Sequence, residues 1–210
     1  MRLVAFAILL AVMDGLPAAR SRPSSVADRR PAAAGQSWEE SDALARKIED
    51  VERRRKEKTA GTRRPTTVSF TDRELSSYLN LAYAEKLPKG LTNVEVQFER
   101  DRVVAKGMLD LDRVKGRVRE NSWSPLSFMS GVVPVEATGK VTGKDGFGTI
   151  VWETVYVSSV RVPITMLEQI VLTSTKNAEY PEGFDIHAPF RLPYAAKSLR
   201  VDRGRAVVAF

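Results

Sequence analysis

The sequence predicts an α+β domain in which a curved antiparallel sheet of about six to eight strands packs against two helices. Three observations support this prediction. Alternating apolar and polar residues recur in pairs of segments joined by short turns, which is typical of antiparallel hairpins. Two other segments carry apolar residues at helical spacing after helix-start signals. The 210-residue chain is 43% hydrophobic, which is enough for one packed core together with additional segments.

Residues 1–21 are predicted to be a signal peptide or an N-terminal anchor. Arg2 precedes an apolar run from Leu3 to Met13, and small residues follow it. This order is typical of a secretory signal. At about 1.5 Å per residue, the run is too short to span a hydrocarbon core of about 30 Å. We therefore expect a periplasmic or secreted protein, with N-terminal membrane anchoring as the alternative.

Residues 22–37 are rich in Pro, Ser, Ala and Arg and predict a flexible linker. Residues 38–64 predict a charged helix followed by a basic linker, because Leu44, Ile48 and Val51 recur at helical spacing between charged residues. One interpretation is a solvated helix with a thin apolar stripe. The alternative is a helix that docks on a protein partner or contacts anionic lipid through its basic residues.

Residues 65–210 are predicted to form the α+β domain. Thr66–Phe70 is a β-branched, alternating strand. Thr71 and Glu74 then form the capping-box pattern that begins a helix, which we expect to run over residues 72–85. The apolar residues of this helix share one face: Leu75, Tyr78, Leu79 and Ala82.

Two hairpins are expected next. The first joins residues 94–98 to residues 103–111 through the charged turn Glu99–Arg102. The second joins residues 133–141 to residues 147–162 through Lys144, Asp145 and Gly146.

The rest of the chain predicts a helix, a strand and a hairpin. Pro163 opens a helix over residues 164–176, where proline is tolerated in the first turn. A strand is expected around Phe184–Ala188, and residues 198–210 read as a closing hairpin. The helix has an apolar face formed by Met166, Leu167, Ile170, Val171 and Ser174.

A weak internal repeat links the two helices to their hairpins. Leu87-Pro88 and Leu192-Pro193 each follow a helix and precede a hairpin with a charged turn. Short hairpin signals are generic, so pseudo-symmetry and chance both remain open. Both alternatives, a true repeat and chance similarity, predict two helices on one curved sheet.

No catalytic or metal-binding constellation is visible in the sequence. The chain has no cysteine, which excludes disulfides, thiolate metal sites and cysteine nucleophiles. His187 is the only histidine and has neither a nucleophile nor a carboxylate cluster near it in sequence. The glycines Gly139, Gly143, Gly146 and Gly148 surround a hairpin turn and do not form a phosphate loop. We therefore expect no enzyme activity, no cofactor and no metal.

The charge distribution argues against a nucleic-acid partner. Residues 1–65 carry 14 Lys and Arg against 9 Asp and Glu, a net charge of +5. Residues 66–210 carry 19 against 17, a net charge of +2. A domain that neutralises several phosphates would concentrate its excess cations in the folded part.

The predicted domain has more apolar residues on its strands than a sheet with one solvent-facing side requires. Between residues 147 and 162, strict alternation places Val151, Val155 and Val157 on one face and Ile150, Trp152 and Tyr156 on the other. A one-sided antiparallel sheet would carry polar residues on its outer face. Either this strand is covered on both sides or one face lines a cavity.

The loop Ser122–Pro134 adds further apolar side chains. They fold back onto the core, or they form a lid or a membrane-touching tip. The candidate lid or membrane residues are Trp123, Leu126, Phe128 and Met129.

Residues 66–210 resemble the bacterial TULIP-type lipid-binding proteins, the group around the LmeA-like periplasmic proteins. The likeness rests on the opening VSFTDRELSSYLN and on the recurring Leu-Pro before a hairpin, which ends the chain as LPYAAKSLRVDRGRAVVAF. The resemblance implies a strongly curved antiparallel sheet around helices, with an apolar groove for lipid. It also implies binding of lipid or another amphiphile at an envelope membrane.

These observations predict an exported, non-catalytic envelope protein that binds or transfers lipid or another amphiphile. The alternative is a structural or adaptor protein of the envelope that binds a protein partner through its charged N-terminal helix. The periodicity predicts an apolar groove between the sheet and both helices, formed by Leu75, Tyr78, Leu79, Trp152, Tyr156, Leu167, Ile170 and Val171.

Overall fold

A computed structural model of the chain describes residues 35–56, 66–88, 90–115, 130–175, 182–183 and 185–210. Within them the predicted α+β class is confirmed, with a nine-stranded antiparallel sheet in place of the six to eight strands expected. The predicted signal or anchor, most of the predicted linker, and the four candidate lid residues Trp123, Leu126, Phe128 and Met129 lie outside the described residues.

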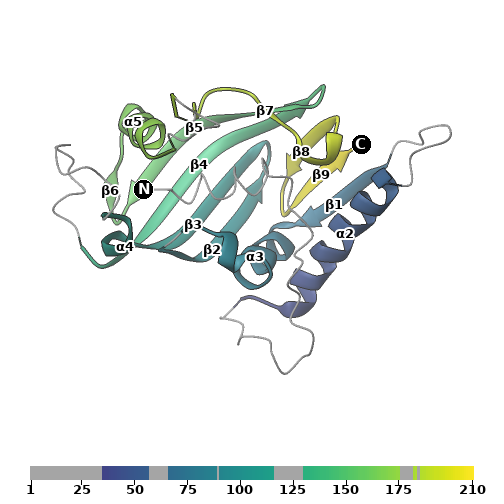
Figure 1. Cartoon of the computed structure of the whole chain (residues 1–210), viewed down its shortest axis with the longest axis horizontal. Coiled ribbons are helices and arrows are strands. Elements are labelled where there is room, and N and C mark those ends of the chain that lie inside the picture. Colours follow the sequence, from purple (N-terminus) through teal and green to yellow (C-terminus); the bar gives the residue numbers. More distant parts are fainter. Residues whose placement is uncertain (1–34, 57–65, 89, 116–129, 176–181, 184) are drawn as a thin grey trace.

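The predicted helices and hairpins occur in the predicted order, and α4 is an additional short helix between the first two hairpins (Figure 1). The helices are α2 (Trp38–Lys56), α3 (Asp72–Leu81), α4 (Leu111–Lys115) and α5 (Ile164–Thr175), with the short 3-10 helices η2 (Ala84–Lys86) and η4 (Pro193–Ala195). The strands are β1 (Thr67–Thr71), β2 (Leu91–Glu99), β3 (Arg102–Asp110), β4 (Val132–Lys144), β5 (Phe147–Val157), β6 (Val160–Arg161), β7 (Phe190–Arg191), β8 (Ser198–Asp202) and β9 (Arg205–Ala209).

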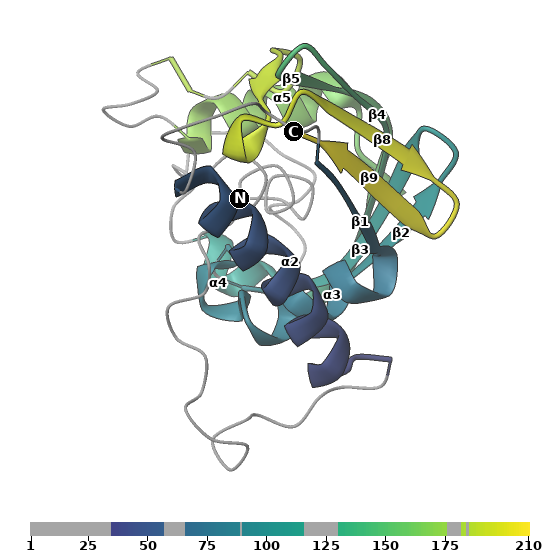
Figure 2. The same cartoon turned by 90° about the vertical axis from the view of Figure 1, so that its right-hand side faces the viewer.

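Strand β4 organises the sheet. Along one edge it pairs with β5, and along the other it pairs first with β3 and then, at Gly143 opposite Leu199, with β8. The β3–β2 and β8–β9–β1 branches therefore leave the same edge of β4. Their turns touch, because the Asp101 amide donates to the Val201 carbonyl at 3.1 Å and the Gly204 amide donates to the Phe98 carbonyl at 2.9 Å. The sheet curves as a result, and the helices lie on its concave side (Figure 2).

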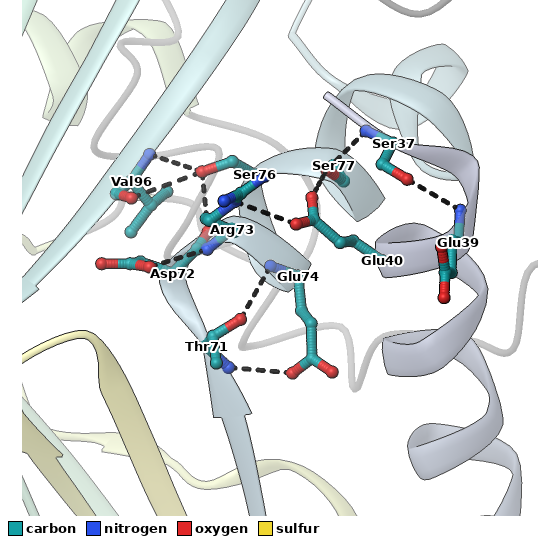
Figure 3. Close-up of polar contacts among 10 residues, drawn as sticks. All are labelled: Ser37, Glu39, Glu40, Thr71, Asp72, Arg73, Glu74, Ser76, Ser77 and Val96. Carbon is teal, nitrogen blue, oxygen red and sulfur yellow. Dashed lines mark hydrogen bonds and ion pairs between the residues drawn. The ribbon is translucent and has the colours of Figure 1, made fainter. Parts of the chain in front are cut away.

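Helix α3 begins at the predicted capping box. The Glu74 amide donates to Thr71 Oγ1 at 3.1 Å, and the Thr71 amide donates to Glu74 Oε2 at 2.9 Å (Figure 3). The helix ends at Leu81 rather than near Glu85, because the Tyr83 amide turns back to the Tyr78 carbonyl at 2.9 Å.

A polar stripe on α3 covers the free edge of β2, which is the last strand of its branch. Asn80 Nδ2 donates to the Val94 carbonyl at 2.6 Å, and the Val94 amide donates to Asn80 Oδ1 at 2.8 Å. The Val96 amide donates to Ser76 Oγ at 2.9 Å. Side chains of α3 thus form the hydrogen bonds that a neighbouring strand would otherwise form with the backbone of β2.

The stripe extends one turn further. Asp72 lies four residues before Ser76, and its Oδ2 accepts from the Phe98 amide at 3.4 Å. Ser76 Oγ also donates to the Asp72 carbonyl at 2.8 Å (Figure 3). Residues four apart lie on one face of a helix, so the stripe runs parallel to the strand that it covers.

Helix α2 packs against α3 and buries its apolar stripe there. Polar contacts fix this packing: the Ser37 amide donates to Ser77 Oγ at 3.1 Å, Ser77 Oγ donates to Glu40 Oε2 at 2.9 Å, and Glu40 pairs with Arg73 at 2.9 Å (Figure 3). The buried stripe consists of Leu44, Ala45, Ile48 and Val51. The apolar stripe, which the sequence left open as part of a solvated helix or as a docking surface, is thus covered by the same chain, and α2 shares a core with the α+β domain.

Helix η4 contains two strained residues. Tyr194 and Ala195 both have φ of 56°, in the left-handed region that costs a residue with a Cβ about 1–2 kcal/mol. Burial, and next the Glu52 carboxylate on α2, raises the pKa of Tyr194 above its usual value. Packing around Tyr194 therefore holds this turn in place.

The predicted strand at Phe184–Ala188 is wrong. Residues 185–188 form a turn in which the His187 amide donates to Asp185 Oδ1 at 2.8 Å and the Ala188 amide donates to the Asp185 carbonyl at 3.3 Å. The strand comes later, as the two residues of β7, which pair with the start of β5.

The predicted alternation along β5 is also wrong, because the strand contains a bulge. Thr138 pairs with Thr154 and Gly139 pairs with Trp152, which leaves Glu153 as an extra residue. The inward positions are Ile150 and Trp152 before the bulge, and Val155 and Val157 after it.

Exposure follows this change of phase. Val151 is 61% exposed whereas Val155 is 2% exposed, although strict alternation had placed both on one face. Tyr156, opposite Glu136, lies on the outer face. On that same face Glu153 pairs with Arg102 at 2.7 Å and with Lys140 at 3.8 Å. Strand β5 therefore buries apolar side chains on its concave face, and its convex face combines the exposed Val151 with paired charges.

We predict that Asn80→Ala destabilises the protein by about 3 kcal/mol, because it leaves the amide and the carbonyl of Val94 without partners. Glu95→Ala, on the exposed side of the same strand, should change stability by about 0.5 kcal/mol or less. Urea unfolding measures both. Equal losses in the two variants would contradict the role assigned to Asn80.

Deletion of Glu153 tests the bulge. Removing this extra residue leaves Ile150, Trp152, Val155 and Val157 in strict alternation on the concave face and keeps their partners on β4, so we expect the variant to fold with a loss of about 2 kcal/mol or less. Glu153→Ala keeps the bulge and removes only exposed ion pairs, with an expected loss of about 1 kcal/mol or less. Deletion of Val151 removes a residue from the same strand but moves Glu153 to the inward position of Trp152, so it should cost more than about 3 kcal/mol. Equal losses for the two deletions, by thermal unfolding, would show that Glu153 is not the extra residue.

Candidate functional site

An apolar cavity of about 80 Å³ lies on the concave face of the sheet, beneath α3. Every residue that lines it is apolar or glycine. The lining residues are Phe70, Leu75, Phe98, Val103, Ala105, Ala137, Gly139, Val141, Ile150, Trp152, Phe190, Leu199, Val201 and Ala206.

Small residues at inward positions of neighbouring strands leave the space. Ala105 on β3 pairs directly with Ala137 on β4, and both side chains point into the cavity. Gly139 follows on β4, and Ala206 contributes from β9. Larger side chains at these positions would fill the space from the sheet side. The cavity therefore exists because the inward side chains of these neighbouring strands are small.

Aromatic rings form the cavity walls. Phe70 of β1 and Phe98 of β2 meet edge to face with their centroids 5.8 Å apart. On the opposite side, the Phe190 ring packs on Gly148, where an added Cβ would lie 2.7 Å from Phe190 Cε2. Trp152 is held by its indole nitrogen, which donates to the Ile186 carbonyl at 3.2 Å.

Two of the predicted groove residues, Leu75 and Trp152, line this cavity. Tyr78 and Leu79 are fully buried elsewhere in the core. Leu167 and Val171 of α5 are buried in the core but are not part of the lining. Tyr156 lies on the convex face, and the side chain of Ile170 lies outside the described residues.

The predicted groove was to lie between the sheet and both helices. The cavity instead takes only Leu75 from a helix, and the other lining residues belong to the sheet. Sequence reasoning missed Phe70, Phe98, Phe190 and Leu199, which lie on four different strands. The signal that could have located the cavity is the run of small residues at inward positions of β3 and β4.

The lining can exclude water and bind apolar groups, and it offers no acid, base or nucleophile. Over the described ranges, no group of three or more His, Cys, Asp or Glu side chains could hold a metal ion. His187 lies outside the cavity lining and faces Glu168, with Nε2 3.9 Å from Oε2. None of the helices in the described part of the chain combines the length and the apolarity that crossing a membrane requires.

Size limits what the cavity holds in this conformation. Pockets for drug-sized ligands enclose about 300–1,000 Å³, and an engineered cavity of about 150 Å³ admits benzene. At about 80 Å³, the space fits the end of one acyl chain. A longer chain requires part of the wall to move.

Comparison with protein-family models, with curated proteins and with solved structures found no match to this chain.

Proposed function

We propose that the protein is an exported, non-catalytic envelope protein that binds or transfers lipid or another amphiphile, with the apolar part of the ligand in the cavity. The observation that carries the proposal is a lining without any charged side chain, on the concave face of a curved sheet. The likeness of residues 66–210 to TULIP-type proteins and the apolar run near the N-terminus support the same function and its location.

The energetics favour a ligand that widens the cavity. Burial of one methylene contributes about 0.8 kcal/mol, so a chain end of four carbons contributes about 3 kcal/mol, which is less than a millimolar affinity requires. Tighter binding needs more buried chain. The wall at Phe190 is the one suited to move, because β7 pairs with β5 over two residues only, whereas Trp152 lies within the long ladder of β4 and β5.

The alternative, an adaptor that recruits a partner through α2, has less support. The apolar stripe of α2 is buried against α3, so only its charged outer surface remains for a partner. Charged surfaces alone add specificity and association rate more than affinity.

Ligand binding is tested with native mass spectrometry of protein purified from membranes and with titration of a fluorescent fatty acid. We expect co-purifying lipid and saturable uptake by the wild-type chain. Ala137→Leu adds three carbon atoms to the cavity wall and should weaken uptake at least about tenfold, since it displaces buried methylenes of the ligand.

Thr142→Leu is the matched control, because Thr142 is exposed on the convex side of the same strand. It should leave uptake unchanged. Thermal unfolding confirms that each variant is folded. A lipid-free mass with no uptake by the wild type, or equal uptake by a folded Ala137→Leu, would rule out this cavity as the binding site.

A further inference from the structure

The tip of the β4–β5 hairpin is held rigidly against the segment before β8. Asp145 and Gly146 have φ of 53° and 84°, as a tight two-residue hairpin turn requires. The Gly146 amide donates to the Lys197 carbonyl at 3.0 Å, and the Leu192 amide donates to the Gly146 carbonyl at 2.9 Å. Side chains on both segments therefore keep a fixed arrangement.

This tip carries an exposed aromatic ring among cations. Phe147 is 46% exposed, and the Arg191 guanidinium carbon lies 5.6 Å from its ring centroid. Lys144 and Lys197 are exposed beside it. Asp145 is the one acidic side chain within residues 144–147, and residues 190–197 contain none.

The same two strands join the tip to the cavity. Phe147 pairs with Arg191 and Gly148 pairs with Phe190, so neighbouring residues point to opposite faces. Phe190 lines the cavity, whereas Phe147 and Arg191 face solvent. The exposed ring and cations thus lie one residue away from the cavity wall.

We propose that this tip, formed by Lys144, Phe147, Arg191 and Lys197, docks on the surface of an anionic lipid bilayer. The cations pair with lipid phosphates, and the Phe147 ring enters the interface between headgroups and acyl chains. The inference deepens the proposed function, since it gives the cavity a route to membrane lipid. Docking is nevertheless measurable without any ligand in the cavity.

A bilayer fits this surface better than a nucleic acid does. The Phe147 ring is the one aromatic in the tip and already contacts a guanidinium, whereas single-strand binding uses successive rings for successive bases. Residues 66–210 have a net charge of only +2, which is low for a phosphate-tracking groove.

The absence of cysteine allows one probe at a time to be attached to the full chain. An environment-sensitive dye is placed on Asp145→Cys and, separately, on Arg203→Cys, which is an exposed turn residue of the β8–β9 hairpin. Each protein is mixed with vesicles of phosphatidylcholine alone, or of equal parts phosphatidylcholine and phosphatidylglycerol. We expect a blue shift at position 145 with the anionic vesicles and none at position 203.

The charge dependence is tested in the protein labelled at position 145. Lys144→Gln combined with Lys197→Gln should weaken binding to anionic vesicles about thirtyfold, because each cation near a bilayer contributes about 1 kcal/mol. Arg100→Gln combined with Arg203→Gln removes the same charge from exposed residues at the other pair of turns and should leave binding unchanged. The N-terminal apolar run is present in every variant, so it cannot account for a difference between them.

The proposal would be overturned by equal shifts at positions 145 and 203, by equal loss in the two double variants, or by the absence of a shift with any vesicle. A shift with duplex DNA but not with vesicles would assign the surface to nucleic acid and overturn it as well. Fatty-acid uptake is measured in parallel. Intact uptake without docking refutes this inference alone, and docking without uptake refutes the proposed function alone.

Discussion

The pairing of α3 with the free edge of β2 is the contact on which the rest of the fold depends. The edge exposes the backbone groups of Val94, Val96 and Phe98, and Asp72, Ser76 and Asn80 satisfy them at four-residue spacing. An uncovered edge strand invites aggregation, and unpaired buried amides are costly. Once this stripe faces β2, the rotation of α3 about its axis is fixed. Leu75 then points to the cavity, and Ser77 and Arg73 contact Glu40 of α2.

Sequence reasoning succeeded where the signal is local. The capping box at Thr71 and the charged turns of the hairpins involve residues a few positions apart, and the structure contains both. Sequence reasoning failed where the pairing of strands that are distant in sequence determines which face a side chain occupies. The bulge at Glu153 shows only in the pairing of β5 with β4, and it reverses the faces of Val155, Tyr156 and Val157 relative to Trp152. Leu75 and Trp152 were identified because they are large and apolar, whereas the cavity itself arises from small residues such as Ala137, which periodicity treats as ordinary core.

The bulge in β5 changes which side chains face inward, and it leaves one cavity as the candidate site for an apolar ligand. The sequence predicts apolar side chains on both faces of β5. In the structure, the convex face combines the exposed Val151 with the Arg102–Glu153 pair. What remains is one small cavity with walls of unequal stiffness. The side built on β3, β4 and β5 is held by long ladders, whereas Phe190 belongs to β7, which pairs with β5 over two residues only. Any chain longer than a few carbons must enter by displacing the softer wall, which lies next to the cationic hairpin tip.

Lipid binding by this protein requires that an apolar chain enters this cavity. The most direct measurement is the nuclear Overhauser effect between the terminal methyl of an isotope-labelled fatty acid and the alanine methyl groups of the protein. We predict contacts to Ala105, Ala137 and Ala206, which line the cavity from three strands. Contacts confined to exposed residues such as Val132 and Val160, with none to these alanines, would contradict it.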